Sequence, residues 1–295
     1  MTSADILAMQ PIAKPWLQWY TGLDHLFYDV GKLSDDEQAG LLQQPEAEGS
    51  LVIVPPGASG RAIQHRQSAA EFLAKDSKAV SALVVAGVGS SVLGTAALAR
   101  NVANAYQIDV AGIVSGHGYL DLLSEALGGF FFYGYTDHYR QLARHFCNTF
   151  ALGCRRAFAR SPRPALNEQA GYARDVSALI EILNADFANL KLLVGHSKGD
   201  LILDYALERF VAGCRPGRRA LFARLQVVTF GAVVDIPKRF RRVHQFIGDM
   251  DPFGWLNSRN YVDHQFVPGA WHHLNTELPF HLDVEAVLTE QLPLA

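Results

Sequence analysis

Short runs of consecutive hydrophobic residues alternate along this chain with longer segments in which hydrophobic residues recur every three or four positions. Short runs rich in Val, Leu and Ile are typical of strands buried on both faces, and the periodic segments are typical of amphipathic helices. The alternation predicts an α/β fold with a mostly parallel central sheet and helices on both faces. The predicted strands span residues 51–54, 82–86, 110–114, 190–196, 225–231 and 242–248, and the main predicted helices span residues 69–76, 92–106, 171–184, 198–212 and 282–291.

The first 48 residues stand outside this alternation, although we expect residues 1–295 to form a single domain. Aromatic and apolar residues are dense between Trp16 and Tyr28 and have helical spacing. Residues 34–50 are polar and acidic, which indicates a short helix and a linker. Residues 1–48 are therefore expected to be an N-terminal arm that packs on the core.

A second long segment separates the strand at 110–114 from the strand at 190–196. Its length of about 75 residues is enough for a helical cap or lid over residues 119–170 as well as a crossover helix. Five aromatic residues fall among the eight residues 128–135, flanked by glycines. This aromatic stretch is either a mobile apolar cover over a binding site or an element buried against the core.

Composition and charge bear on the class of protein. Hydrophobic residues make up 49% of the chain, enough for one large domain, and the net charge of −3 gives no reason to expect a nucleic-acid partner. No apolar run reaches the ~18 residues of a membrane span, and the first residues lack the basic and then apolar pattern of a signal peptide. An odd number of cysteines favours buried free thiols and a cytoplasmic protein. The three are Cys147, Cys154 and Cys214.

The pattern Gly195-x-Ser197-x-Gly199 lies between a predicted strand and a predicted helix. In that context the pattern is typical of a sharp turn that exposes a nucleophilic serine at the end of a sheet. The glycines keep side chains out of a tight turn, and the N–H group of Lys198 opens the helix, where it could hold an oxyanion. The alternative is a tight turn that carries an ordinary serine.

A glycine-rich turn at residues 87–91 follows the strand at 82–86. A dinucleotide site would need a third glycine where Val92 stands, and no Gly-Lys-Ser/Thr follows for a phosphate loop. We therefore interpret the turn as an oxyanion loop, in which the amide of Ser90 is the expected second donor.

Six short pieces of the chain match, in order, one known sequence pattern. They are Gly-His-Gly-Tyr-Leu-Asp at 116–121, Gly-His-Ser-Lys-Gly at 195–199, Thr-Phe-Gly-Ala at 229–232, Asp-Met-Asp-Pro at 249–252, the set Tyr261, His264 and Trp271, and Leu-Pro-Phe-His-Leu at 278–282. With them, about residues 80–290 resemble the class 3 lipases, the fungal triglyceride lipase-like family of the α/β-hydrolase superfamily. Asp200 stands where that family has a second glycine, and the family's Arg-Gly-Thr oxyanion motif is absent.

The resemblance implies an α/β-hydrolase fold and a Ser-His-Asp mechanism without a metal ion or an organic cofactor. For the acid, Asp251 lies in a Gly-x-x-Asp-Pro turn after the strand at 242–248, while Asp249 fits the lipase pattern Asp-x-x-Pro. Both could point the same way in an extended turn. We choose Asp251, because the turn after a strand of this order is where the acid of such enzymes lies.

For the base, His281 precedes the last helix and fits the family. His272 fits a more general Gly-x-x-His pattern, and His273 is its neighbour. We choose His281, with His272 or His273 as the alternative. His196 is expected to pack against or orient the turn of the nucleophile. A zinc site formed by the three histidines is disfavoured, because adjacent histidines rarely face one ion and no acidic ligand pattern accompanies them.

The sequence thus predicts a serine hydrolase, a lipase or esterase, that acts on a small-molecule or lipid ester. An acyltransferase or polyester-handling enzyme would use the same three residues, with an alcohol in place of water as the acceptor. A non-catalytic binding protein on this fold is the third alternative. No cofactor, nucleic acid or membrane-spanning segment is expected, and the sequence does not specify an oligomeric state.

Overall fold

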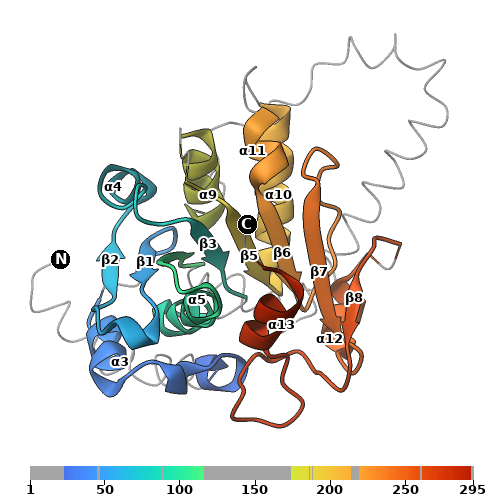
Figure 1. Ribbon diagram of the computed structural model, residues 1–295, viewed down its shortest axis with the longest axis horizontal. Coiled ribbons are helices and arrows are strands. Elements are labelled where there is room, and N and C mark those ends of the chain that lie inside the picture. Colours follow the sequence, from blue (N-terminus) through green and yellow to red (C-terminus); the bar gives the residue numbers. More distant parts are fainter. Residues whose placement is uncertain are drawn as a thin grey trace, which may run out of the picture. The chain divides into compact units, whose positions relative to one another are not determined.

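The computed structural model describes residues 23–44, 47–87, 90–115, 174–185, 187, 189–213, 219–259 and 261–293. Within these ranges eight strands form one mixed sheet in the order β2-β1-β4-β3-β5-β6-β7-β8 (Figure 1). All neighbouring strands from β4 to β8 are parallel, and β1 is antiparallel to both β2 and β4. The strands are β1 Leu51–Val54, β2 Gln64–Arg66, β3 Ala82–Val85, β4 Val110–Ile113, β5 Leu192–His196, β6 Gln226–Phe230, β7 Arg242–Gly248 and β8 Gln265–Val267.

Helices pack on both faces of the sheet, and each face has its own hydrophobic cluster. One cluster joins the sheet to α5 and α13, and the other joins it to α4, α9 and α10. The α-helices are α3 Asp35–Leu42, α4 Ala69–Lys75, α5 Val92–Tyr106, α9 Arg174–Asn184, α10 Lys198–Ala212, α11 Arg219–Arg224, α12 Pro252–Asn257 and α13 Val284–Gln291, and the 3-10 helices are η1 Val30–Lys32 and η2 Gly57–Ser59.

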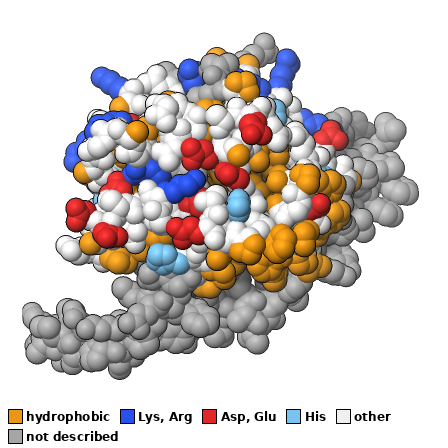
Figure 2. Space-filling model, turned by 60° about the horizontal axis from the view of Figure 1, so that its bottom comes forward, with side chains coloured by type: hydrophobic (Ala, Val, Ile, Leu, Met, Phe, Trp, Pro, Cys, Tyr) orange, Lys and Arg blue, Asp and Glu red, His pale blue; other side chains and the backbone are white. Residues whose placement is uncertain are grey.

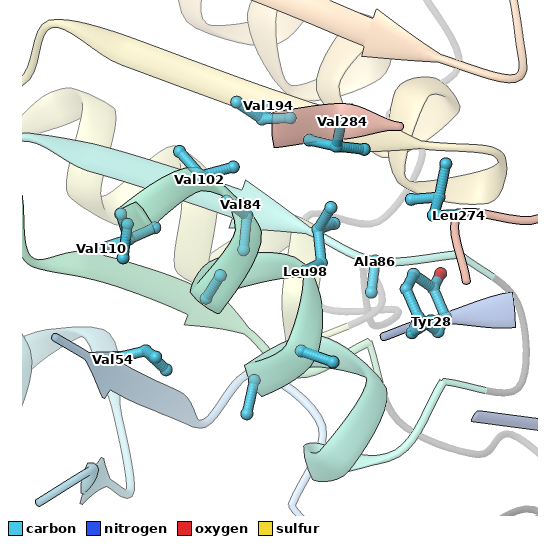
Figure 3. Close-up of a cluster of buried hydrophobic side chains, with 14 of the residues drawn as sticks. Tyr28, Val54, Val84, Ala86, Leu98, Val102, Val110, Val194, Leu274 and Val284 are labelled. Atoms are coloured by element: carbon cyan, nitrogen blue, oxygen red, sulfur yellow. The ribbon is translucent and has the colours of Figure 1, made fainter. Parts of the chain in front are cut away.

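Strand β3, in the middle of the sheet, is hydrophobic at every position because both of its faces are covered. In β3, Ala82 and Val84 belong to the α5 and α13 cluster, whereas Leu83 and Val85 belong to the α4, α9 and α10 cluster. All four side chains are fully buried. Figure 3 shows the first of these clusters, in which Tyr28 lies beside the sheet with Ala86 and Leu274. The predicted α/β class is therefore confirmed, with a sheet that is mostly parallel.

The predicted strands and helices are present, with ends that differ by three residues or fewer. The elements that we did not predict are short: β2, β8, α11, α12 and the two 3-10 helices. Of the other predictions, the aromatic cluster as far as residue 22, the cap at 119–170 with its aromatic stretch at 128–135, and all three cysteines lie outside the described residues. Among the helices that the structure describes, none is long and apolar enough to cross a membrane.

The described part of the N-terminal arm packs on the core through buried carboxylates as well as apolar side chains. Asp24 is buried and accepts a hydrogen bond from the amide of Ser91 at 3.1 Å. Asp29 is also buried and accepts from the side chain of Asn101 at 2.9 Å and from the hydroxyl of Thr276 at 2.7 Å. The arm therefore connects α5 to the loop that precedes α13.

The direction of the connections changes at β3. The chain passes from β3 through α5 to β4 on one side, and the next strand, β5, lies on the other side of β3. In open α/β sheets, ligands bind at the carboxyl ends of the strands that flank such a change. This rule directs attention to the residues just after β3 and β5.

Candidate active site

Ser197 occupies the single position between the end of β5 and the start of α10. Its backbone has φ 55° and ψ −117°, a positive φ that residues with a side chain rarely adopt. The glycines on either side are required by space, because a Cβ at Gly195 would collide with the carboxyl of Asp200 and a Cβ at Gly199 with the backbone of Val85. The turn is thus as tight as the sequence predicted.

A continuous chain of hydrogen bonds joins Ser197, His272 and Asp251. The hydroxyl Oγ of Ser197 lies 2.9 Å from Nε2 of His272, and Nδ1 of His272 lies 2.6 Å from Oδ2 of Asp251. Because an ionised carboxylate can only accept, Nδ1 donates to Asp251, and Nε2 of the neutral ring accepts the proton of Ser197. All three residues are buried, with 6%, 7% and 0% exposure in the same order.

Asp251 is fixed by the start of α12, which it caps. Its Oδ1 accepts a hydrogen bond from the amide of Gly254 at 2.7 Å, so each carboxyl oxygen has a partner. The alternative acid, Asp249, is exposed and accepts from the amide of Gly269 at 2.7 Å. Of the two carboxylates that the sequence left open, Asp251 is therefore the one that contacts a histidine next to Ser197.

The histidine in contact with Ser197 is His272, and our choice of His281 is corrected. Nδ1 of His281 donates to the carbonyl of Leu278 at 2.8 Å, and Nε2 of His273 donates to the carbonyl of Pro279 at 3.0 Å. These two rings therefore make local contacts in the loop before α13. His272 was the alternative that the Gly-x-x-His pattern had indicated.

Comparison of the chain with protein-family models, with curated proteins and with solved structures finds no match. The chemistry of the site is therefore argued from its own geometry. Among the described residues, no group of three or more His, Cys, Asp or Glu side chains is arranged to hold a metal ion. What the site offers is a hydroxyl, an imidazole hydrogen-bonded to it, and a buried carboxyl group hydrogen-bonded to the other side of that imidazole.

A second chain of hydrogen bonds lies behind the first and passes through His196. The amide of Gly87 donates to the hydroxyl of Tyr28 at 2.6 Å, and that hydroxyl lies 2.9 Å from Nδ1 of His196. Nε2 of His196 lies 3.0 Å from the carbonyl oxygen of His272 and must donate to it. Tyr28 was named in the sequence only as one member of an aromatic cluster, since nothing in its neighbours indicates this contact.

Burial decides the protonation state of this second chain. It lowers the pKa of His196 to about 3, and the nearby ring of His272 contributes in the same direction. Burial also raises the pKa of Tyr28 well above its ordinary value. Near neutral pH both groups are therefore uncharged, so His196 carries one ring proton, on Nε2, and accepts the Tyr28 proton at Nδ1.

The two expected oxyanion donors differ in their surroundings. Lys198 is the first residue of α10, and N–H groups in the first turn of a helix point toward its N-terminal end, here beside Ser197. The amide of Ser90 instead donates to the carbonyl of Gly87 at 3.4 Å, and its hydroxyl donates to the carbonyl of Ser91 at 3.4 Å. The Ser90 side chain also forms a hydrogen bond with the hydroxyl of Tyr28. The role of Ser90 as the second oxyanion donor stays a prediction. Residues 88 and 89 lie outside the described residues.

Apolar side chains surround the ring of His272. The rings of Phe27 and Phe253 lie 6.2 and 6.0 Å from it between centroids, and Phe253 also packs against Trp271 at 5.8 Å. Figure 2 shows one face of the molecule on which hydrophobic side chains gather into one area. Phe253 is itself exposed, so the site has an apolar neighbour at the surface that could receive an apolar part of a substrate. The exposed apolar side chains on α12, on β8 and in the adjoining loops include Met250, Phe253, Trp255, Leu256, Phe266 and Phe280.

Asp200 is a buried carboxyl group beneath the turn of Ser197. It is fully buried, and neither of its oxygens makes a hydrogen bond of ordinary geometry with the described residues. Burial raises its pKa well above the usual value, although amide groups of Phe230, Ala232 and Ser197 approach it and offset part of this effect. Asp200 is therefore poised to take up a proton on folding.

This proton uptake makes a prediction for stability. A native pKa above the unfolded value of 3.8 gives stability that is complete below that value and is lost as pH rises through the native pKa. Asp200→Asn removes the ionisation and keeps the shape of the side chain. As pH rises above 3.8, we expect the melting temperature of the variant to rise relative to that of the wild type by several degrees, because only the wild type loses this contribution. The titration of His196 is common to both proteins and cancels in the difference. If the melting temperatures of the two proteins depended on pH in the same way, the raised pKa of Asp200 would be contradicted.

Proposed function

We propose that the protein is a serine hydrolase of the α/β-hydrolase type that cleaves carboxylic esters. The observation that carries the proposal is the hydrogen-bonded chain from Asp251 through His272 to Ser197. A serine hydroxyl is a weak nucleophile unless a base removes its proton as it attacks, and this arrangement supplies that base. The order Ser, Asp, His along the sequence is also that of α/β-hydrolases.

The proposed reaction has two halves. Oγ of Ser197 attacks the ester carbonyl carbon as Nε2 of His272 takes the hydroxyl proton, and the tetrahedral intermediate collapses when that proton passes to the leaving alcohol. Water then attacks the acyl-enzyme, gives its proton to His272, and releases the acid and the serine. Asp251 holds Nδ1–H of His272 and stabilises the imidazolium that forms in each half.

The negative charge on the carbonyl oxygen needs donors during both halves. The N–H group of Lys198 at the start of α10 is the donor best placed for it, because it immediately follows the nucleophile and benefits from the helix dipole. The apolar surface around Phe253 and Trp271 supports an ester with a hydrophobic acyl or alcohol group. Binding of that group would exclude water from the side of His272 that faces solvent.

A fluorophosphonate probe tests the proposal directly, because it reacts with an activated serine and leaves ordinary serines unmodified. We expect the folded protein to be labelled at one residue, Ser197, as located by peptide mass spectrometry. Ser197→Ala should abolish the labelling, whereas Ser50→Ala, which changes another buried serine, should keep it. A folded wild-type protein that stays unlabelled would favour a non-catalytic binding protein on this fold.

A further inference from the structure

We propose that Tyr28 and His196 are positioning residues of this active site, which hold the main chain at His272 so that its imidazole bridges Ser197 and Asp251. The inference rests on the proposed function and deepens it. Neither residue reaches the position of a substrate in this role, since both lie behind the first chain of hydrogen bonds. Their effect would pass through the backbone carbonyl of His272, which accepts from Nε2 of His196.

His272 needs support because it lies in a loop without regular secondary structure. After β8 ends at Val267, the chain runs to the start of α13 at Val284 through turns and irregular segments. Its side chain must nevertheless contact two residues on different elements, at 2.9 Å and 2.6 Å. A misplacement of about 1 Å in such a geometry can lower a rate by about 100-fold.

In the second chain of hydrogen bonds, each group donates to the next one. Gly87 donates to Tyr28, Tyr28 donates to His196, and His196 donates to the carbonyl of His272. The tautomer of His196 is set by the carbonyl of His272, which can only accept and so requires the proton on Nε2. The Tyr28 hydroxyl then donates to Nδ1 and fixes the orientation of the ring. With its proton on Nε2, the ring of His196 donates a hydrogen bond to the carbonyl of His272.

The same arm residues hold the loop on its other side. The carbonyl of Phe27 accepts from the amide of Leu274 at 2.8 Å, and the carbonyl of His25 accepts from the side chain of Asn275. The ring of Phe27 meets that of His272 edge to face. Residues 25–29 thus contact the loop immediately after His272, and Tyr28 joins this contact to the turn of Ser197.

Two substitutions of His196 separate positioning from simple packing. In His196→Gln, the side-chain nitrogen can occupy the place of Nε2 and donate to the His272 carbonyl. In His196→Asn, the shorter amide can meet the Tyr28 hydroxyl at the place of Nδ1 but cannot reach His272. We expect the Asn variant to lose kcat by about 10- to 100-fold with KM little changed, and the Gln variant to recover most of that loss.

Which of the two variants has the higher kcat decides between positioning and simple packing. If the Asn variant equals or exceeds the Gln variant in kcat while both are folded by circular dichroism, the bond to His272 is not what His196 provides, and the proposal is overturned. Wild-type protein that neither hydrolyses esters nor reacts with the fluorophosphonate would instead overturn the proposed function, before any variant is compared.

Tyr28→Phe provides an independent test if either His196 variant fails to fold. It removes one hydroxyl group and keeps the ring that packs in the core. Nδ1 of His196 then has no donor and the amide of Gly87 has no acceptor, so the His196 ring is held less firmly against the His272 carbonyl, and we expect kcat to fall by about tenfold at constant KM. The fluorophosphonate probe should still label all of the Ser197 in the end, but at a lower rate. A folded Tyr28→Phe protein with the kcat of the wild type would refute the role of Tyr28.

Discussion

Replacing Ser197 with alanine is expected to lower kcat for ester hydrolysis by about 10⁴-fold or more, the largest effect of any single substitution in this protein. The loss follows because the oxygen of this hydroxyl forms the bond to the acyl group. Without the hydroxyl, His272 has no proton to accept from residue 197. Hydrolysis of a p-nitrophenyl ester, followed by release of p-nitrophenol, measures the change. Alanine retains the Cβ and so keeps the backbone strain at residue 197 unaltered. We therefore expect the variant to fold like the wild type, so that the loss reflects chemistry.

The control for this variant is Ser50→Ala, which removes a hydroxyl from a buried serine that directly precedes β1. Since that hydroxyl makes no hydrogen bond with the described residues, we expect a kcat close to that of the wild type. If Ser197→Ala retained wild-type turnover with an unchanged melting temperature, the serine mechanism would have to be abandoned.

The second large effect is expected at His272 and Asp251. His272→Ala removes the base, and Asp251→Asn presents an amide that favours the wrong tautomer of His272, so each should lower kcat by about 10³- to 10⁴-fold. Asparagine is also a good helix cap and keeps an oxygen for the amide of Gly254, so α12 should remain in place. Michaelis–Menten kinetics with a soluble short-chain ester, beside thermal melts, would record both variants.

The sequence offers a matched control for each of these changes. His281→Ala and Asp249→Asn alter the neighbouring candidates, whose hydrogen bonds go to the backbone of Leu278 and Gly269 and not to Ser197 or His272. We expect their kcat values to remain within about threefold of the wild type. A severe loss at His281 together with a mild one at His272 would mean that the loop before α13 has a different arrangement in the working enzyme.

The turn of Ser197 and the central strands could be read from the sequence because their signals are local. A run such as residues 82–86 must be buried on both faces, and two glycines around Ser197 fit only a tight turn. The short elements β8 and α12 carry no such signal, since three strand residues or six helical residues do not span two full periods. Their absence from the prediction left the path of the chain after β7 undefined.

That undefined path is the reason why the sequence did not select the histidine. His272, His273 and His281 lie within ten residues, and each could face Ser197 if the loop turned suitably. The distinction rests on contacts such as the 2.6 Å hydrogen bond from the amide of Trp271 to the carbonyl of Phe280, which folds the loop back on itself. Likewise, the contact between Tyr28 and His196 depends on tertiary structure and has no counterpart in the residues near either one.

The two hydrogen-bonded chains connect positions that are far apart in the sequence. Tyr28 and His196 are 168 residues apart, His196 and His272 are 76 apart, and Ser197 and His272 are 75 apart. Closing such long loops is unfavourable until the sheet between them has formed. During refolding, the capacity to react at Ser197 should thus return only with the last cooperative step, later than helical circular dichroism, so that recovered activity reports completion of the native sheet.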